Sequence, residues 1–354
     1  MDWPLVLLVT AVAGVGLLNL RSAAEVAGTS FHLTQLTRMI LGLGVAGLIA
    51  SQDYRLASRW AYVILGLITL LLLLVFPVGT TLNNSRRWLD LGVFLLQPSE
   101  LLRVAVVVAA ARYYHDHEVP GGRGLRHLVV PTALCLAPCL LVVMQPDLGT
   151  ALVIMFIFGT MTLFDGIRRT TLVAALVAAL IFAPVMWQFG MRDYQRDRVV
   201  AFLNPDENLQ GDAYQVNQSR IAIGSGRLLG KGYLQGTQVQ NGFVPEHEND
   251  FIFAHHGEQF GFVGSLALLG LYFGLIAWSL RIARWARDRF GVLCAVGVAS
   301  FFFWHVLINL GMVTGLLPVV GLWLPLVSYG GSSVLAVSCA VGLLLSISIR
   351  RISR

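Results

Sequence analysis

Residues 58–78 have the sequence SRWAYVILGLITLLLLLVFPV, in which no charged side chain follows Arg59. A helix that crosses a lipid bilayer needs about 17–25 mostly apolar residues, and this stretch meets that length. Similar stretches recur along the whole chain. We therefore predict about ten spanning helices, near residues 3–19, 35–51, 58–78, 98–115, 128–144, 149–164, 171–188, 256–280, 290–314 and 329–348.

The composition favours one membrane domain over a soluble fold. Hydrophobic residues make up 56% of the 354 residues and charged residues only 12%, whereas soluble domains carry about 25% charged residues. The net charge of +6 comes mostly from arginines in short loops between apolar stretches. That distribution is typical of membrane topology and gives no reason to expect nucleic acid as a partner. The predicted fold is an all-α polytopic membrane domain that comprises residues 1–354.

The arginines also predict the orientation, because cytoplasmic loops carry an excess of positive charge. With the N-terminus inside, the short outer loops contain only Arg21, Arg86 and Arg87. The inner segments then contain Arg55, Arg59, Arg112, Arg123, Arg126, Arg168, Arg169, Arg281, Arg284, Arg287, Arg289, Arg350, Arg351 and Arg354. We expect both termini in the cytoplasm and residues 189–255 as a long extracytoplasmic loop between the seventh and eighth helices. Because Met1-Asp2-Trp3 lacks the basic region of a signal peptide, the first apolar stretch is expected to be a retained helix.

The long outer loop combines cations with carboxylates. Arginine forks match phosphate oxygens, and a carboxylate can accept a proton from an attacking hydroxyl. The loop therefore suits a phosphorylated substrate, although its charges could equally pair with one another in a solvated loop. The candidate residues are Arg196, Arg198, Lys231, Glu246 and Asp250.

Several ionisable residues fall within or beside the predicted helices. A charge at the centre of a spanning helix costs about 2.5–3.5 kcal/mol, so such residues usually face a cavity or a partner. Glu100 and Arg103 share one helix face, and for them a structural ion pair is as plausible as a substrate contact. Asp147 interrupts the fifth and sixth helices, and Glu258 begins the eighth.

Two further features leave alternatives open. The 246–256 region contains metal-ligand residue types but no H-E-x-x-H motif, so a loosely held Mg²⁺ or Mn²⁺ beside a pyrophosphate is more plausible than a transition metal. The 315–333 segment contains two prolines and repeated glycines that break any helix. Non-helical backbone at membrane depth survives only against protein or a wet cavity, which would also suit a transporter.

Motifs in this chain resemble those of the SEDS family, which governs bacterial shape, elongation, division and sporulation. They run in the family's order across nearly the whole chain: QPSELLR at 97–103, QPDLGT at 145–150, GKG at 230–232, PE at 245–246, DFIF at 250–253 and LPLVSYGGSS at 324–333. Within the family, the start at Asp2-Trp3 and the stretch GMVTGLLP at 311–318 resemble RodA, the elongation member, more than FtsW, the division member.

The resemblance implies a peptidoglycan glycosyltransferase in the bacterial cytoplasmic membrane that polymerises lipid II at the outer face during cell elongation. It also implies a class B penicillin-binding protein and other elongation-complex membrane proteins as partners. Asp250 matches the family's essential carboxylate, and Lys231 matches its GKG motif. The chain departs from the family at Arg103, where lysine is usual, at the spacing 247–249 before Asp250, and at His255-His256, where apolar residues are common.

On this reading Asp250 takes the proton of the acceptor hydroxyl, and cationic side chains stabilise the departing pyrophosphate. The cations are Arg196, Arg198 and Lys231, with Arg86 and Arg87 from the second outer loop. Glu100, Arg103 and Asp147 shape a polar cavity, and Glu246 and Glu258 complete the expected substrate site. The alternatives are a lipid II flippase and a scaffold that recruits the cross-linking partner. No cofactor is required by this chemistry beyond the possible divalent cation.

Overall fold

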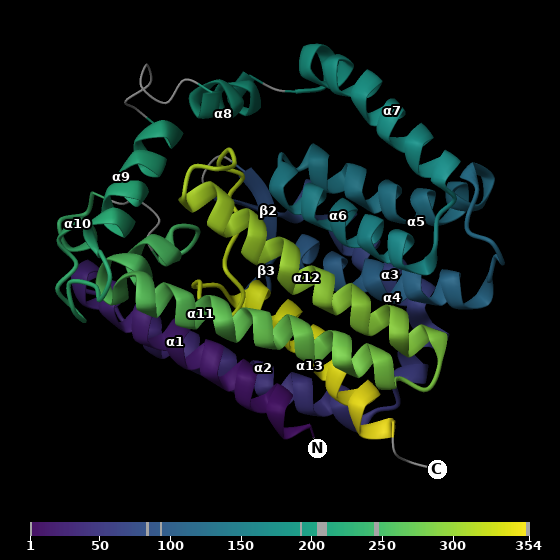
Figure 1. Cartoon of the computed structure of the whole chain (residues 1–354), viewed down its shortest axis with the longest axis horizontal. Helices are drawn as coiled ribbons and strands as arrows, with labels where there is room; N and C mark the ends of the chain where they lie inside the picture. The colour runs from purple at the N-terminus through teal and green to yellow at the C-terminus, as the bar shows by residue number, and fades with distance from the viewer. Residues whose placement is uncertain are drawn as a thin grey trace.

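The computed structural model describes residues 2–82, 85–92, 94–191, 193–203, 211–243 and 248–351. A long helix forms at each of the predicted spans (Figure 1). These helices are α1 (Trp3–Ala27), α2 (Phe31–Ser51), α3 (Tyr54–Val78), α4 (Pro98–Asp116), α5 (Leu125–Met144), α6 (Leu148–Asp165), α7 (Arg169–Val185), α11 (Ile252–Trp285), α12 (Arg289–Val313) and α13 (Gly331–Arg350).

Within the described residues, nine of these helices are long and apolar enough to cross a membrane. The remaining one is α4, which carries Glu100, Arg103 and Arg112. In α12 and α13, 78% and 83% of the most apolar window is buried inside the protein, so these helices form the centre of the bundle. Only 6% is buried in α7, which Figure 1 shows apart from the other helices. Apolar side chains on α7 such as Leu180, 74% exposed, suit contact with lipid.

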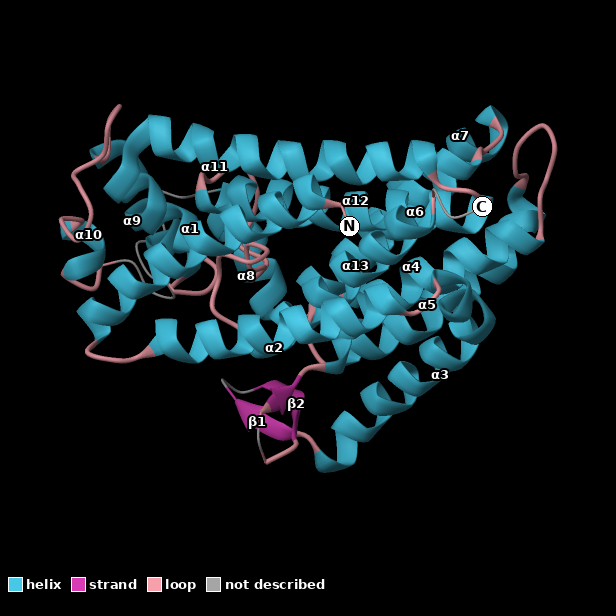
Figure 2. Ribbon diagram, turned by 90° about the horizontal axis from the view of Figure 1, so that it is seen from below, coloured by secondary structure: helices cyan, strands magenta, loops and turns pink. Residues whose placement is uncertain are grey.

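The predicted outer loop is partly helical. It contains a π-helical turn η1 (Met186–Gly190), α8 (Asp193–Leu203), α9 (Asp212–Ser225) and the short α10 (Thr237–Gln240). The loop after α3 differs from the all-α prediction, because it forms a small antiparallel sheet in the order β1 (Thr80–Leu82), β2 (Ser85–Asp90), β3 (Leu95–Leu96). Figure 2 shows this sheet projecting from one side of the bundle. Its strands are too short for a periodic pattern to have indicated them.

Helix α11 begins four residues earlier than predicted and bends sharply at Gly261, where φ is 65° and ψ is −160°. The bend frees the N–H groups of Phe262 and Val263, which donate to the carbonyls of Arg227 and Leu228 at 2.9 and 3.0 Å. A Cβ at Gly261 would lie 2.2 Å from the nitrogen of Gly230, so the loop and the bend can approach this closely only because glycine has no side chain. The stretch containing GKG therefore docks the outer loop onto α11.

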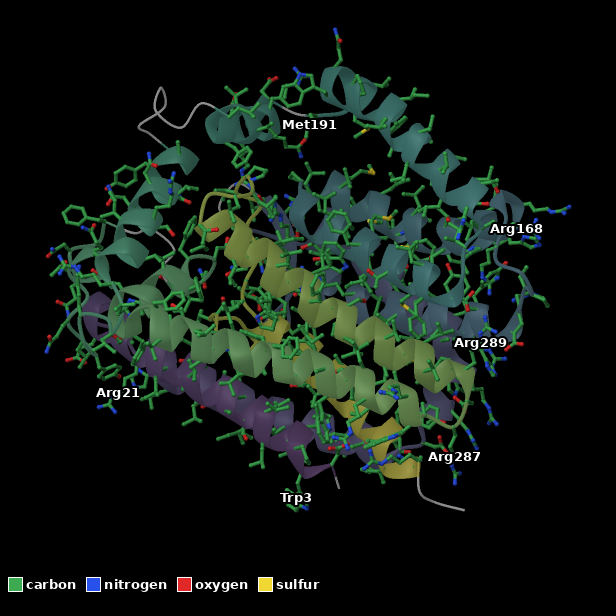
Figure 3. All side chains as sticks on the ribbon, viewed as in Figure 1. Trp3, Arg21, Arg168, Met191, Arg287 and Arg289 are labelled. Carbon is green, nitrogen blue, oxygen red and sulfur yellow. The ribbon has the colours of Figure 1, made fainter. Side chains whose placement is uncertain are left out.

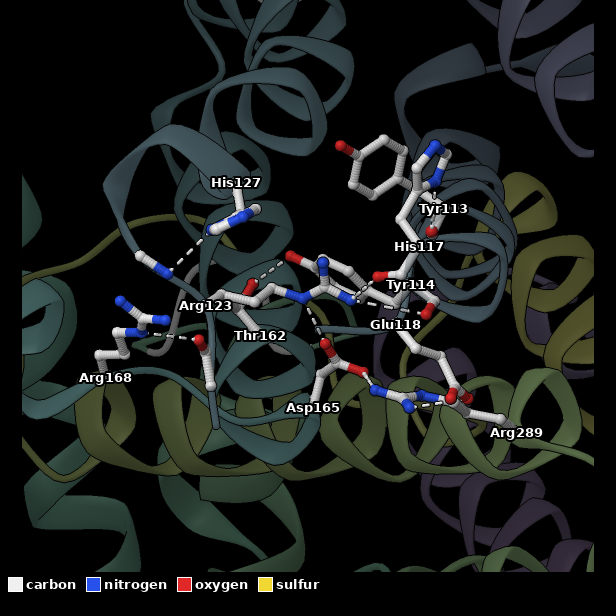
Figure 4. A network of polar contacts seen from close by, with 12 residues as sticks. Tyr113, Tyr114, His117, Glu118, Arg123, His127, Thr162, Asp165, Arg168 and Arg289 are labelled. Atoms are coloured by element: carbon white, nitrogen blue, oxygen red, sulfur yellow. Dashed lines mark hydrogen bonds and ion pairs between the residues drawn. The ribbon is translucent and has the colours of Figure 1, made fainter. Parts of the chain in front are cut away.

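At the opposite end of the bundle a buried network of ion pairs links the loop after α4 to α6 and α12 (Figure 4). Arg123 forms an ion pair with Asp165, and each of the two side chains is 1% exposed. Arg123 also donates to the carbonyl of His117 at 2.7 Å. Arg289 bridges Asp165 at 2.5 Å and Glu118 at 2.8 Å. In Figure 3, Arg168, Arg287 and Arg289 lie toward this end and Arg21 lies away from it, which places arginines of two predicted inner segments together.

The Asp165→Asn variant is expected to lose about 3–5 kcal/mol of stability, because it leaves the Arg123 guanidinium buried without a counter-charge. Thermal unfolding in detergent, followed by fluorescence, measures the change. Asp116→Asn is the matched control: its ion pair with Arg112, at 2.7 Å, is about one-third exposed, and such pairs contribute about 1 kcal/mol or less. Equal melting temperatures for the two variants would contradict a structural role for this network of ion pairs.

Candidate functional site

The segment between α12 and α13, residues 314–330, is not helical and lies among the buried helices. Gly321 and Leu326 adopt φ of +71° and +65° there. This broken segment holds residues 248–250, which precede α11. The Ser328 hydroxyl donates to the carbonyl of Asn249 at 2.6 Å, and the backbone N–H of Tyr329 donates to the carbonyl of Glu248 at 2.9 Å.

Asp250 is half-buried, and a hydrogen bond to its backbone carbonyl fixes its position. The amide of Asn309, on α12, donates to the carbonyls of Asp250 and Leu322 at 2.8 and 2.6 Å. Phe251 and Ile252 are buried and anchor the chain directly after the carboxylate. A Cβ built at Gly321 would lie 3.4 Å from Oδ2 of Asp250, so the carboxylate lies against the backbone of the broken segment. The absence of a side chain at Gly321 leaves space next to this oxygen.

The broken segment also contacts an enclosed ion pair formed by Glu100 and Arg103. Their side chains are 4% and 0% exposed. Arg103 donates to the hydroxyl of Thr150 at 2.8 Å, and its Cζ lies 5.3 Å from the centre of the Trp323 ring. Trp323 belongs to the broken segment, and its indole N–H donates to Glu100 at 3.0 Å. The pair therefore fixes the same segment that Asp250 contacts.

Asp147 and Arg87 hold the break between α5 and α6. Asp147 caps α6 by accepting from the N–H of Thr150 at 3.2 Å, and it lies 3.9 Å from Arg87 and 3.3 Å from the Gln97 amide. Arg87 also donates to the carbonyl of Gln145, at 3.0 Å, and to that of Pro146. Four predicted site residues, Arg87, Glu100, Arg103 and Asp147, thus meet in one polar cluster.

Lys231 and Glu258 form a second, separate pair at 2.6 Å. The Glu258 side chain is fully buried, and its Oε1 also accepts from the backbone N–H of Gln238 at 2.8 Å. Lys231 donates in addition to the hydroxyl of Thr237 at 2.8 Å. The two residues tie the outer loop to α11, close to the bend at Gly261.

The remaining predicted cations lie at the ends of helices or in the outer loop. Arg196 donates to the carbonyls of Trp187 and Gln188 at 3.0 and 2.8 Å, and Arg86 donates to that of Phe76 at 2.9 Å. Both arginines therefore satisfy carbonyls that the last turn of a helix leaves without partners. Arg198 and Arg220 line a small open pocket of about 40 Å³ between α8, α9 and the start of the broken segment. Glu246 lies outside the described residues.

Sequence reasoning missed Asn309, Thr150 and Trp323. An asparagine in a mostly apolar span was a usable signal, because a polar side chain at that depth usually has a partner. The tryptophan had no such signal. Among the residues that the structure describes, no group of three or more His, Cys, Asp or Glu side chains is placed to hold a metal ion.

Comparison with known proteins identifies relatives over the full length of the chain. Residues 3–352 match the family model FTSW_RODA_SPOVE, described as cell cycle protein. The chain is 40% identical over 315 residues to the peptidoglycan glycosyltransferase MrdB of Escherichia coli K12, covering 89% of this chain and 84% of the relative. It is 33% identical over 363 residues to the stage V sporulation protein E of Bacillus subtilis, covering 98% and 96%.

Solved structures agree with these relatives. A chain from a peptidoglycan synthase complex that coordinates polymerization and crosslinking superposes with a TM-score of 0.86 at 32% identity, covering 100% of this chain and 99% of the other. The rod shape determining protein RodA of Thermus thermophilus superposes with a TM-score of 0.74 at 30% identity, covering 100% and 98%. The chain therefore belongs to the FtsW/RodA/SpoVE family of cell cycle proteins, which is the SEDS family.

Proposed function

We propose that this chain is a peptidoglycan glycosyltransferase that polymerises lipid II at the outer face of the bacterial cytoplasmic membrane during cell elongation. The placement of Asp250 carries the proposal. This half-buried carboxylate lies against Gly321, and hydrogen bonds from Asn309 and Ser328 fix the backbone of residues 249 and 250. The name peptidoglycan glycosyltransferase, given to the MrdB relative, supports the same chemistry.

In the proposed reaction the hydroxyl oxygen of an acceptor sugar attacks the anomeric carbon of a second lipid II molecule. Asp250 accepts the proton of this hydroxyl as the new bond forms. The bond from that carbon to the pyrophosphate breaks, and the undecaprenyl pyrophosphate departs with the electron pair. Because pyrophosphate leaves without protonation, one carboxylate suffices, unlike the two that glycosidases use. In the proposal Arg198 stabilises the leaving group, because it lines an open pocket beside the start of the broken segment.

The other predicted substrate residues support this site in the proposal. Arg196 and Arg86 donate to backbone carbonyls and add positive potential from fixed positions. Lys231 is neutralised by Glu258, so in the proposal this pair fixes the outer loop on α11. Glu100, Arg103, Asp147 and Arg87 hold the broken segment and the α5–α6 break. Glu246 as a substrate residue and a divalent cation beside the pyrophosphate remain predictions from the sequence. Cytoplasmic termini, a class B penicillin-binding protein and other elongation-complex membrane proteins as partners complete the proposal.

Reconstitution tests the reaction class. The chain is placed in liposomes with a class B partner whose transpeptidase serine is disabled, and labelled lipid II is added. Glycan strands on a gel, absent when the partner is reconstituted alone, are the expected result. Lipid II that crosses the membrane while no strands form would instead establish the flippase alternative.

Gly321→Ala is expected to lower strand formation about tenfold to 100-fold, because a displacement of about 1 Å at a reacting group has effects of that size. The displacement comes from the backbone, because φ of +71° is unfavourable for alanine by about 1–2 kcal/mol; the new methyl itself would touch the Asp250 carboxylate at an ordinary contact distance of 3.4 Å. The rate is measured beside the melting temperature. Gly47→Ala is the control, since its Cβ would meet nothing within 4 Å. An unchanged rate for Gly321→Ala would show that the backbone here does not shape the site.

A further inference from the structure

Five side chains form a closed ring at the end of the bundle where both termini lie (Figure 1). Asp2 accepts from the indole N–H of Trp278 at 2.8 Å. The guanidinium carbon of Arg281 lies 4.6 Å from the ring centre of Trp278 and 4.3 Å from that of Trp285. Arg351 lies 4.5 Å from Trp285, and its Nη1 is 3.8 Å from Asp2. The start of α1 and the ends of α11 and α13 therefore meet in one constellation, which we call the Asp2 ring.

The buried carboxylate at its base organises the ring. Asp2 is 4% exposed and also accepts from the Ser348 hydroxyl at 2.5 Å and from the N–H of Leu5 at 3.5 Å. These bonds fix the position of one indole and attract one guanidinium. The two arginines are held in place before any ligand arrives, which reduces the entropy that binding must overcome.

The arginines keep donors available. A guanidinium stacked flat on an indole still presents its N–H groups at its edges. Arg281 is exposed, and no described carboxylate lies within ion-pair distance of it. The Arg351 side chain is 23% exposed; its buried Nη1 faces Asp2 at 3.8 Å and makes no hydrogen bond within the described part of the chain, so a ligand reaches Arg351 from its exposed edge. Arg284 in the last turn of α11 and Arg287 just after it are also exposed, so within the described residues this end of the helix carries several arginines around the single Asp2 carboxylate of the ring.

The position of the ring along the helices identifies the ligand. Tryptophan side chains concentrate at the boundary between membrane and water, and long apolar helices run from the ring into the bundle. Trp285 is 42% exposed, and Leu280 and Ile349, near the ends of α11 and α13, are also exposed. An anion that reaches the ring from lipid therefore brings apolar chains that these side chains can cover.

We propose that Arg281 and Arg351, held by Trp285, bind the phosphate of an anionic phospholipid. Basic pockets between spanning helices favour such head groups over zwitterionic ones, because a zwitterionic head group brings a cation of its own to a positive site. The bound lipid would hold the ends of α1, α11 and α13 together. This site is independent of the proposed glycosyl transfer, which takes place near the opposite end of α11.

The test uses the purified full chain in detergent with added dioleoyl phosphatidylglycerol or dioleoyl phosphatidylcholine. Native mass spectrometry measures bound phospholipid, and thermal unfolding measures stabilisation. Each arginine near an anionic lipid contributes about fivefold in affinity, so Arg281→Gln is expected to weaken phosphatidylglycerol binding about fivefold and Arg281→Gln with Arg351→Gln about 25-fold. Trp285→Leu, which keeps both charges, is expected to weaken it several-fold.

Arg126→Gln is the matched control, because Arg126 is also an exposed arginine near the inner end of a helix but is not part of the ring. It is expected to leave phosphatidylglycerol binding unchanged. The proposal is overturned if Arg126→Gln weakens binding as much as Arg281→Gln, if the two lipids bind equally, or if inorganic phosphate stabilises the chain as well as phosphatidylglycerol. Where the double variant does not fold, the single Arg281→Gln variant decides, since Arg281 has no described ion-pair partner to lose.

Discussion

Asp250→Asn is expected to lower the rate of glycan-strand formation by about 100-fold to 10,000-fold, the usual contribution of a general base. Asparagine has nearly the shape of aspartate but cannot accept the proton of the attacking hydroxyl. Asn309 binds the backbone carbonyl of residue 250 and Ser328 that of residue 249, so these contacts survive the substitution. The melting temperature is therefore expected to stay close to that of the wild type while the rate falls.

The measurement is lipid II polymerisation with the class B partner, followed on gels over time. Asp193→Asn serves as the control, because the Asp193 side chain is 97% exposed in the same outer loop. It is expected to polymerise at the wild-type rate. Strand formation by Asp250→Asn at more than about a tenth of the wild-type rate would assign the base to another residue.

The positions of the spanning helices were predictable because the length and apolarity of a segment are properties of the local sequence. Length and apolarity could not indicate the bend in α11, since it depends on carbonyls of Arg227 and Leu228 that lie far from Phe262 and Val263 in sequence. The same limit explains the sheet beside α3, whose register is a pairing between short segments.

The site was predictable in its residue types but not in their pairings. The sequence predicted Lys231 and Glu258 as separate substrate contacts, whereas in the structure they form an ion pair with each other. It grouped Arg196 with phosphate ligands, whereas two of its donors go to carbonyls at the end of η1. A charged side chain in an outer loop has many possible partners, and the choice among them depends on the tertiary arrangement. Glu100 and Arg103 were predictable as a pair because helix spacing alone brings them together.

Arg103→Leu is expected to lose about 3–5 kcal/mol of stability, as much as Asp165→Asn, because it leaves the Glu100 carboxylate buried without its counter-charge. The double variant Glu100→Leu with Arg103→Leu removes both charges. Apolar replacements for a buried ion pair are often neutral or stabilising, so this variant is expected to recover a melting temperature near that of the wild type. Arg103→Lys keeps the charge opposite Glu100 and is expected to retain both stability and activity.

Activity distinguishes the two roles that the pair could have. In the double variant the Trp323 indole N–H and the Thr150 hydroxyl each lose a partner, so the broken segment loses a contact that fixes it beside Asp250. We therefore expect strand formation to stay about tenfold to 100-fold below the wild type although the protein is stable. Recovery of both stability and rate would show that the pair serves folding alone. A stable double variant with a low rate, next to an active Arg103→Lys, would show that the enclosed pair positions the segment on which the carboxylate depends.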